Sequence, residues 1–391
     1  MTAAHPDTPG TAVPLLAGSS VPPAEVYDVA LLDLDGVVYV GPDAVPGVPD
    51  ALAAARRAGM RLGFVTNNAA RTPEQVADHL TVLGVPADAD DVITSSQAAA
   101  TVVAGLLGSG ARVLPVGGPG IAAALTAAGL TVVERAEDEP VAVVQGYGRE
   151  VGWAELAEAV VAVRQGARHV ATNADATVPS PRGPLPGNGA MVGVVRNVTG
   201  QAPLVTGKPD PAMHAECVRR TGARRPLVVG DRLDTDIEGA RRAGAASLLV
   251  LTGVTDPTVL LAAEPQQRPD LLAEDCAGLL RTHPPVVPDG PSWRCGEWTA
   301  RAGEGGDVLV LESAAGEGAD DGLDGLRVLC AAHWSRHPAQ GAPARVVAAG
   351  TRAEEALRRW SLTSSTGSGE WRRRPTGACA AAAGREGPPR A

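Results

Sequence analysis

Short apolar runs alternate with longer alanine-rich stretches over most of the chain. Residues 29–34 and 62–66 have the length and composition of buried strands, and residues 49–58 between them predict a helix. A second helix is expected after Thr72-Pro73, because a threonine followed by proline is a common helix start. Further strand-like runs lie at residues 112–116, 141–145, 169–172, 227–230 and 247–251. This alternation predicts an α/β fold with a parallel sheet.

The pattern changes near residue 283. Residues 283–291 contain four prolines, and five of the six tryptophans follow this stretch. Beyond it we expect a strand at 308–311 and helices at 323–337 and 353–360. The C-terminal part of the chain is therefore predicted to form a small, separate α/β module.

The charge of the chain excludes some functions and draws attention to one residue. The 391 residues include 34 basic and 44 acidic side chains, a net charge of -10. A general nucleic-acid binder would need a basic face to neutralise phosphates, so this balance argues against one. All but one of the basic residues are arginines, and the single lysine of the chain is Lys208. A lone lysine in a Gly-Lys-Pro turn suggests a specific role.

Cysteines and apolar stretches indicate the compartment. The five cysteines include no Cys-x-x-Cys pair, which predicts neither a disulfide framework nor a zinc site. The N-terminus lacks the basic start and apolar centre of a secretion signal, and no stretch has the ~18 apolar residues of a membrane span. We therefore expect a soluble, cytoplasmic protein without a membrane partner.

The first candidate for chemistry is Asp33-Leu34-Asp35-Gly36, at the end of the first predicted strand. Side chains two apart on a strand point to the same side, so Asp33 and Asp35 can face each other. Two neighbouring carboxylates repel unless a cation or a shared proton lies between them, which suggests Mg²⁺. The alternative is a simple Asp-Gly turn at the strand end.

Polar residues follow other predicted strands as well. Thr66-Asn67-Asn68 offers a hydroxyl and two amides that suit phosphate oxygens, and Asp231 follows the strand at 227–230. Because the carboxyl ends of parallel strands share one edge of the sheet, Asp231 can complete an oxygen-only metal site with Asp33. Helix capping explains the nearby Asp234, and it explains Asp231 poorly.

These elements together resemble the haloacid dehalogenase superfamily of phosphohydrolases. The shared pattern is Asp-x-Asp-Gly, a Thr at a strand end, a Lys, and Gly-Asp followed five residues later by Asp, which here is Asp236. The stretches around Lys208 and Asp231 resemble the subfamily with a C2-type cap, which includes glycerol 3-phosphate, phosphoglycolate and 4-nitrophenyl phosphate phosphatases. The resemblance covers about residues 26–280 and implies a Rossmann-like core.

The resemblance implies a role for each motif residue. Asp33 would be the nucleophile that forms an aspartyl phosphate, and Asp35 would act first as acid and then as base. Lys208 would offset charge in the transition state. The phosphoryl oxygens would be held by Thr66 and the main-chain N–H of Asn67, and Asn68 is a further candidate for substrate binding. Mg²⁺ would be held by Asp33, Asp231 and the main-chain carbonyl of Asp35, with Asp236 supporting the site.

The resemblance also implies a cap inserted between the Thr and Lys motifs, which would close over the site and select the substrate. Asn173 and Asp175 are the cap residues most expected to line it; an ordinary loop turn is the alternative for Asp175. The resulting division is a disordered N-terminus (1–24), a core (25–94 and 204–282), a cap (95–203), a proline-rich linker (283–291), a C-terminal module (292–361) and a disordered tail (362–391).

The C-terminal module resembles the acetyltransferase-like segment behind actinobacterial glycerol 3-phosphate phosphatases, although it has no clear loop for cradling acetyl-CoA. This pairing ranks glycerol 3-phosphate first among small phosphorylated metabolites, ahead of phosphoglycolate, sugar phosphates and nucleoside monophosphates. A non-catalytic ligand sensor and a phosphoryl transferase between sugar positions are the alternatives of another class. The sequence leaves a homo-oligomer open.

Overall fold

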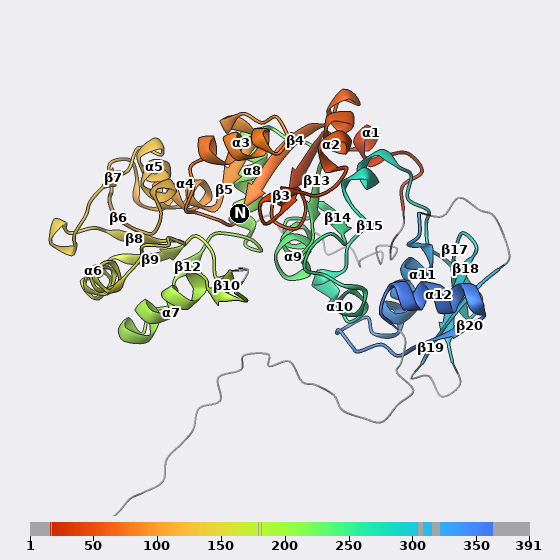
Figure 1. Cartoon of the computed structure of the whole chain (residues 1–391). Helices are drawn as coiled ribbons and strands as arrows, with labels where there is room; N and C mark the ends of the chain where they lie inside the picture. The colour runs from red at the N-terminus through yellow and green to blue at the C-terminus, as the bar shows by residue number, and fades with distance from the viewer. Residues whose placement is uncertain are drawn as a thin grey trace, which may run out of the picture.

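The structure is a computed structural model that describes residues 16, 18–178, 180, 182–303, 308–314 and 321–362. Most of the two segments predicted to be disordered lies outside these residues. Where the N-terminal segment is described, it is packed against the rest of the chain: Leu16 is buried, and Ser19 exchanges two main-chain hydrogen bonds with His283. The described residues form three large sheets and two short hairpins, and the cap sheet and the C-terminal sheet lie on opposite sides of the core sheet (Figure 1).

The core is a six-stranded parallel sheet in the order β15-β14-β13-β1-β4-β5. Its strands are β1 (Val29–Leu32), β4 (Arg61–Thr66), β5 (Val92–Thr94), β13 (Pro226–Gly230), β14 (Ala246–Val250) and β15 (Leu271–Ala273). The helices of this part are α1 (Pro23–Val26), α2 (Val48–Arg57), α3 (Pro73–Val82), α8 (Pro211–Thr221), α9 (Glu238–Arg242) and α10 (Pro257–Leu261). The predicted parallel α/β core is confirmed.

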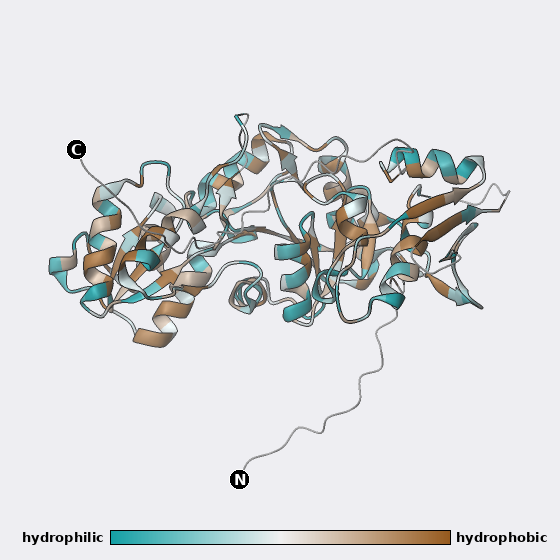
Figure 2. Cartoon of the chain, turned by 90° about the horizontal axis from the view of Figure 1, so that it is seen from below, coloured by the Kyte–Doolittle hydropathy of each residue, from teal (hydrophilic) through white to brown (hydrophobic). Residues whose placement is uncertain are grey.

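The central strand β1 lies where the chain changes direction across the sheet. β4 pairs with one side of β1, and β13, which comes after the cap, pairs with the other. Such a switch point leaves a crevice at the carboxyl ends of the strands. All four residues of β1 are buried, as expected for a strand covered on both faces, and the core strands are largely apolar in Figure 2.

A second parallel sheet, in the order β12-β9-β8-β6-β7, forms the cap. Its strands are β6 (Arg112–Val116), β7 (Thr131–Val132), β8 (Ala142–Gln145), β9 (Arg168–Ala171) and β12 (Leu204–Val205), with helices α4 (Ser95–Leu107), α5 (Pro119–Ala127), α6 (Trp153–Arg164) and α7 (Asn188–Thr199). A short hairpin joins β10 (Thr177–Val178) to β11 (Leu185–Pro186). Since β12 pairs with β9, this sheet extends two residues past the predicted cap end at 203.

The C-terminal sheet has the order β16-β17-β18-β19-β20 and is antiparallel except for the β19–β20 pair. Its elements are β16 (Val287–Asp289), β17 (Ser292–Cys295), β18 (Trp298–Ala302), β19 (Leu309–Ser313), β20 (Val346–Ala349), α11 (Asp324–Arg336) and α12 (Thr351–Arg359). The first strand, β16, lies inside the stretch predicted as a linker, so residues 287–289 are part of the sheet and not connecting chain.

The C-terminal module shares a hydrophobic cluster with the core domain. Residues of α11 cluster with Leu249, Leu260 and Leu272 of the core. The buried Arg327 on α11 donates to the carbonyl of Leu272 at 2.6 Å and forms ion pairs with Asp321 and Asp324. Because a shared apolar core and the hydrogen bond from Arg327 to the Leu272 carbonyl both cross this boundary, the two parts pack as one body.

Among the described residues, no helix is long and apolar enough to cross a membrane.

Candidate active site

Three strand ends and one loop bring the predicted motif residues together. Asp33 follows β1, Thr66 ends β4 and Asp231 follows β13, and these three strands are neighbours in the sheet. Lys208 lies in the turn between β12 and α8, opposite these ends. The side chains therefore meet at the crevice that the strand order creates.

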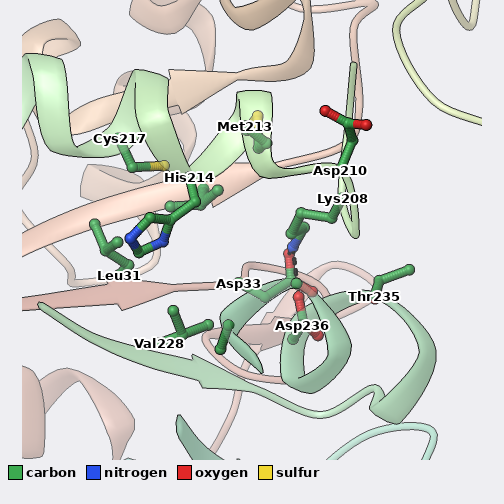
Figure 3. Close-up of a pocket in the computed structure, with 13 residues that line it drawn as sticks. Leu31, Asp33, Lys208, Asp210, Met213, His214, Cys217, Val228, Thr235 and Asp236 are labelled. Carbon is green, nitrogen blue, oxygen red and sulfur yellow. Dashed lines mark hydrogen bonds and ion pairs between the residues drawn. The ribbon is translucent and has the colours of Figure 1, made fainter. Parts of the chain in front are cut away.

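Lys208 lies between two carboxylates. Its Nζ is 2.6 Å from Asp33 Oδ1 and 2.7 Å from Asp236 Oδ1, and its side chain is only 10% exposed. Figure 3 shows the ammonium pointing toward both groups. Burial alone would lower the pKa of Lys208, but the charges of Asp236 and Asp33 outweigh it and raise the pKa above its ordinary value. The group is a fixed positive charge beside the predicted nucleophile.

A narrow apolar crevice lies behind this lysine. It has a volume of about 30 Å³ and is lined on the apolar side by Leu31, Met213, Cys217 and Val228 (Figure 3). Burial raises the pKa of the Cys217 thiol to about 12, so the thiol stays protonated. These side chains, from α8 and from the core strands β1 and β13, form an apolar wall beside the Lys208 ion pairs.

Three carboxylates converge where the metal was predicted. Oxygens of Asp33, Asp231 and Asp236 lie within 4.8 Å of one another. Asp231 is fully buried; its Oδ2 accepts a hydrogen bond from the Val254 N–H at 2.7 Å, and its Oδ1 has no hydrogen-bond partner among the described residues. Burial and the nearby charge of Asp33 raise the pKa of Asp231 to about 6.

This donor set fits Mg²⁺. The ion prefers oxygen ligands, and a buried carboxylate oxygen without a partner is an expensive arrangement unless a cation binds it. Asp236 is already committed on both oxygens, because Oδ1 pairs with Lys208 and Oδ2 accepts from the Arg232 N–H at 3.2 Å. The contacts of Asp236 therefore agree with a supporting position and leave Asp33 and Asp231 as the carboxylates for direct binding.

Asp35 lies two residues beyond Asp33, at the exposed mouth of the site. Gly36 follows it with a φ of +87°, a conformation that favours glycine, and this turn leads into the short hairpin of β2 (Tyr39–Val40) and β3 (Asp43–Ala44). Although the side chain contacts solvent, the surrounding protein and then the charge of Asp33 raise the pKa of Asp35 to about 6. A carboxyl group with such a pKa can both give and take a proton near neutral pH.

The three residues of the Thr66-Asn67-Asn68 turn make different contacts. The Thr66 hydroxyl is buried and accepts a hydrogen bond from the Asn68 N–H at 3.0 Å, which leaves its O–H free to donate. The exposed Asn68 side chain accepts from the Ala70 N–H at 2.9 Å and holds the turn. The Asn67 side chain points to the Lys208 main chain instead of presenting both amide atoms to the cavity.

A cavity of about 440 Å³ extends from the carboxylates to the cap. Asn173 and Asp175, both predicted, line it; Asn173 Nδ2 donates to the Asn67 carbonyl at 2.7 Å and Asp175 Oδ2 accepts from Asn67 Nδ2 at 3.3 Å. Burial raises the pKa of Asp175, and Arg232 opposes the rise. The cap thus forms one wall of the cavity, and its residues bond directly to Asn67 of the core.

Several lining residues were missed by the sequence reasoning. Tyr147, Thr177 and Arg232 line the cavity, as does Val254 in the loop after β14. Val254 was detectable in principle, because the strand at 247–251 also ends at the carboxyl edge of the sheet. Tyr147 and Thr177 come from cap loops whose approach depends on tertiary packing, and no local pattern marks them.

The comparisons with known proteins agree with this geometry. A haloacid dehalogenase-like hydrolase model matches residues 30–131, a HAD-hydrolase-like model matches residues 205–279, and a GCN5-related N-acetyltransferase-like domain model matches residues 295–362. The chain belongs to the haloacid dehalogenase-like hydrolases and carries an acetyltransferase-like C-terminal domain. The predicted family and fold class are confirmed.

Named relatives refine the class of enzyme. The chain is 45% identical over 347 residues to D-glycerol 3-phosphate phosphatase of Mycobacterium tuberculosis, which covers 88% of this chain and 96% of the relative. An acid sugar phosphatase of Staphylococcus haemolyticus is 38% identical over 59% of this chain and 87% of its own length. The predicted class, a phosphatase of this family, is confirmed.

Solved structures show the same likeness. The glycerol phosphate phosphatase of M. tuberculosis in complex with magnesium matches with a TM-score of 0.78 and 43% identity over 88% of this chain and 99% of that one; its calcium complex gives 0.80 and 44% with the same coverage. A 4-nitrophenylphosphatase of Thermotoga maritima matches with a TM-score of 0.61 and 30% identity over 66% of this chain and 98% of its own. The predicted metal, Mg²⁺, agrees with the magnesium complex.

Proposed function

We propose that this protein is a Mg²⁺-dependent phosphatase that hydrolyses a small phosphomonoester, with glycerol 3-phosphate as the first candidate. The observation that carries the proposal is the contact of Lys208 with Asp33 beside the buried Asp231 Oδ1, which has no hydrogen-bond partner in the described part of the chain. The choice of substrate is supported by the D-glycerol 3-phosphate phosphatase relative, which is 45% identical to this chain over 96% of its own length. An acidic protein of this kind handles a phosphate through one local positive site.

The first half of the proposed reaction forms an aspartyl phosphate. The carboxylate of Asp33 attacks phosphorus while the bond from phosphorus to the ester oxygen breaks. Asp35, whose pKa is raised to about 6, gives its proton to the leaving alkoxide. The Lys208 ammonium and the Thr66 hydroxyl hold the phosphoryl oxygens, so that negative charge is offset where it develops.

The second half releases phosphate. Asp35, now ionised, takes a proton from a water molecule that attacks phosphorus, and the bond between phosphorus and the Asp33 oxygen breaks. Bound Mg²⁺, held by Asp33, Asp231 and the main-chain carbonyl of Asp35, would supply further positive charge to the phosphoryl group. Asp236 keeps Lys208 in place from the opposite side.

We assign different roles to the cap and the C-terminal module. The cap residues Asn173 and Asp175 would contact the leaving group, since they line the cavity beyond Asp33. We assign no acetyltransferase activity to the C-terminal module, because its sequence shows no clear loop for cradling acetyl-CoA. We place the protein in the cytoplasm, where small phosphorylated metabolites are available.

Phosphate release from a substrate panel tests the proposal. Full-length protein is assayed with glycerol 3-phosphate, sugar phosphates, phosphoglycolate and nucleoside monophosphates, with and without Mg²⁺. We expect Mg²⁺-dependent release with the highest kcat/KM for glycerol 3-phosphate. A sugar phosphate in first place would favour the second candidate, which the acid sugar phosphatase relative supports. Saturable binding without turnover of any ester would contradict the proposal and favour a ligand sensor.

A further inference from the structure

The side chain of Asn67 connects two parts of the molecule that belong to different domains. Its Oδ1 accepts a hydrogen bond from the Lys208 N–H at 2.9 Å, and its Nδ2 donates to the Lys208 carbonyl at 3.2 Å. The same Nδ2 lies 3.3 Å from Asp175 Oδ2 in the cap. One amide group therefore holds both main-chain polar atoms of Lys208 and also contacts a cap carboxylate.

The main chain at Asn67 makes the same connection. Its carbonyl accepts a hydrogen bond from Asn173 Nδ2 of the cap at 2.7 Å and another from Ser95 Oγ, at the start of α4, also at 2.7 Å. α4 is the first helix after the core strand β5. The position of Asn67 is thus fixed by the cap loop and by the beginning of the cap connection, in addition to its own strand.

Lys208 needs such support. It lies in the turn between β12 and α8, outside both elements, and its charged end must stay between Asp33 and Asp236 on a long, flexible stem. The turn also passes tightly under the cap loop, because a Cβ on Gly207 would lie 2.1 Å from the Thr172 carbonyl oxygen and 2.7 Å from Asn67 Oδ1. A shift of the cap loop toward the turn must therefore displace Asn67, the Lys208 turn or both.

We propose that Asn67 is a positioning residue that ties the main chain of Lys208 to the cap through Asp175. The inference rests on the proposed phosphatase function and adds to it a route by which cap position controls the ammonium group. With the cap loop in contact, Asn67 aligns Lys208 with Asp33; when the loop moves away, Asn67 loses its cap contacts and Lys208 loses a fixed support.

The test compares full-length wild-type protein with Asn67→Ala, Asp175→Ala and the double variant, using 4-nitrophenyl phosphate and Mg²⁺. Lys208 acts on transition-state charge, so Asn67→Ala should lower kcat about 10- to 100-fold and change KM by less than about threefold. Asp175→Ala should lower kcat by a smaller factor. If Asp175 acts through Asn67, its effect on kcat should disappear in the Asn67→Ala background.

Ser96→Ala is the matched control. Ser96 Oγ donates to the Ala69 carbonyl at 3.1 Å, so the variant removes a buried hydrogen bond from the same junction without touching Lys208. Its kcat should equal that of wild type. Thermal midpoints of all variants separate a folding defect from a catalytic one: a lower midpoint for Asn67→Ala with wild-type kcat per folded molecule would overturn the inference.

The remaining outcomes are also decisive. A kcat of Asn67→Ala within about twofold of wild type would overturn the positioning role while leaving the phosphatase proposal intact. Losses in kcat that multiply in the double variant would show that Asp175 acts through its own contact with the leaving group, and would overturn the proposed tie between the cap and Lys208. A wild-type protein that hydrolyses neither 4-nitrophenyl phosphate nor any ester of the panel would overturn the proposed function, and this inference with it.

Discussion

Replacing Gly253 by alanine should weaken Mg²⁺ binding through Asp231. Gly253 lies in the loop after β14, and a Cβ there would be 2.0 Å from Asp231 Oδ2 and 2.5 Å from Asp231 Cγ. The carboxylate is enclosed on the other side as well, since a Cβ on Gly36 would lie 2.5 Å from the same oxygen. The two glycines let the backbone approach the carboxylate and hold it in place.

The size of the effect follows from this geometry. To restore an ordinary contact, the Asp231 carboxylate must move by roughly 1 Å, and a shift of that size is enough to spoil an active-site geometry. Mg²⁺ tolerates little departure from its preferred ligand distances. We expect Mg²⁺ affinity to fall by a factor of about 10 to 100, or about 1.4 to 2.7 kcal/mol of binding free energy.

The assay is a Mg²⁺ titration read in two ways, by thermal midpoint and by phosphate release. Ligand binding to the folded state raises the midpoint, so the Gly253→Ala curve should shift to higher Mg²⁺ concentration in both measurements. Gly193→Ala in α7 is the matched control, because a Cβ there has no neighbour within 4 Å. An unshifted titration for Gly253→Ala would refute the assignment of Asp231 as a metal ligand.

Three further predictions address the lysine, the domain junction and the cap. Lys208→Arg should lower kcat at least about 100-fold despite the retained charge, because a planar fork cannot fit between Asp33 and Asp236 as an ammonium does; wild-type rates would contradict this. Arg327→Met should lower the free energy of unfolding in urea by about 3 to 5 kcal/mol, since it breaks the ion pairs with Asp321 and Asp324 inside the C-terminal module and the hydrogen bond to the Leu272 carbonyl across the junction; an unchanged midpoint would show that stability does not depend on these contacts. Burial lowers the pKa of His169 to about 4, so this side chain stays neutral in the folded protein, whereas in the unfolded chain it takes up a proton below about pH 6.5. The free energy of unfolding should therefore fall by up to about 3 kcal/mol as the pH drops from 6.5 to 4, compared with the His169→Gln variant. Parallel pH profiles of the two proteins would exclude this contribution.

The parallel core and the position of the site were predictable because both follow from short-range patterns. Asp33 and Asp231 follow apolar strands, and the strand-end rule places such residues at one edge of a parallel sheet. Lys208 stood out by composition, as the single lysine in the chain. The structure brings all three together, with the ammonium in contact with Asp33.

The connections between domains were not predictable in the same way. Asn67 was expected to bind phosphate through its main-chain N–H, and no local pattern indicated that its side chain bonds the Lys208 turn, 141 residues further along the chain. Strand β16 was hidden in a proline-rich stretch, since Val287–Asp289 is too short to show a periodicity. Arg327 resembles a surface residue by type and becomes buried only because α11 lies between the C-terminal sheet and the core. Such features depend on long-range packing.

The central claim, that Asp33 attacks phosphorus, is tested most directly by the Asp33→Asn variant. The amide retains the shape of the side chain but is a poor nucleophile and a weaker metal ligand. Phosphate release from glycerol 3-phosphate in Mg²⁺ should fall by at least about 10³-fold, while the thermal midpoint without metal stays close to that of wild type. Undiminished phosphate release by Asp33→Asn would contradict the proposed mechanism.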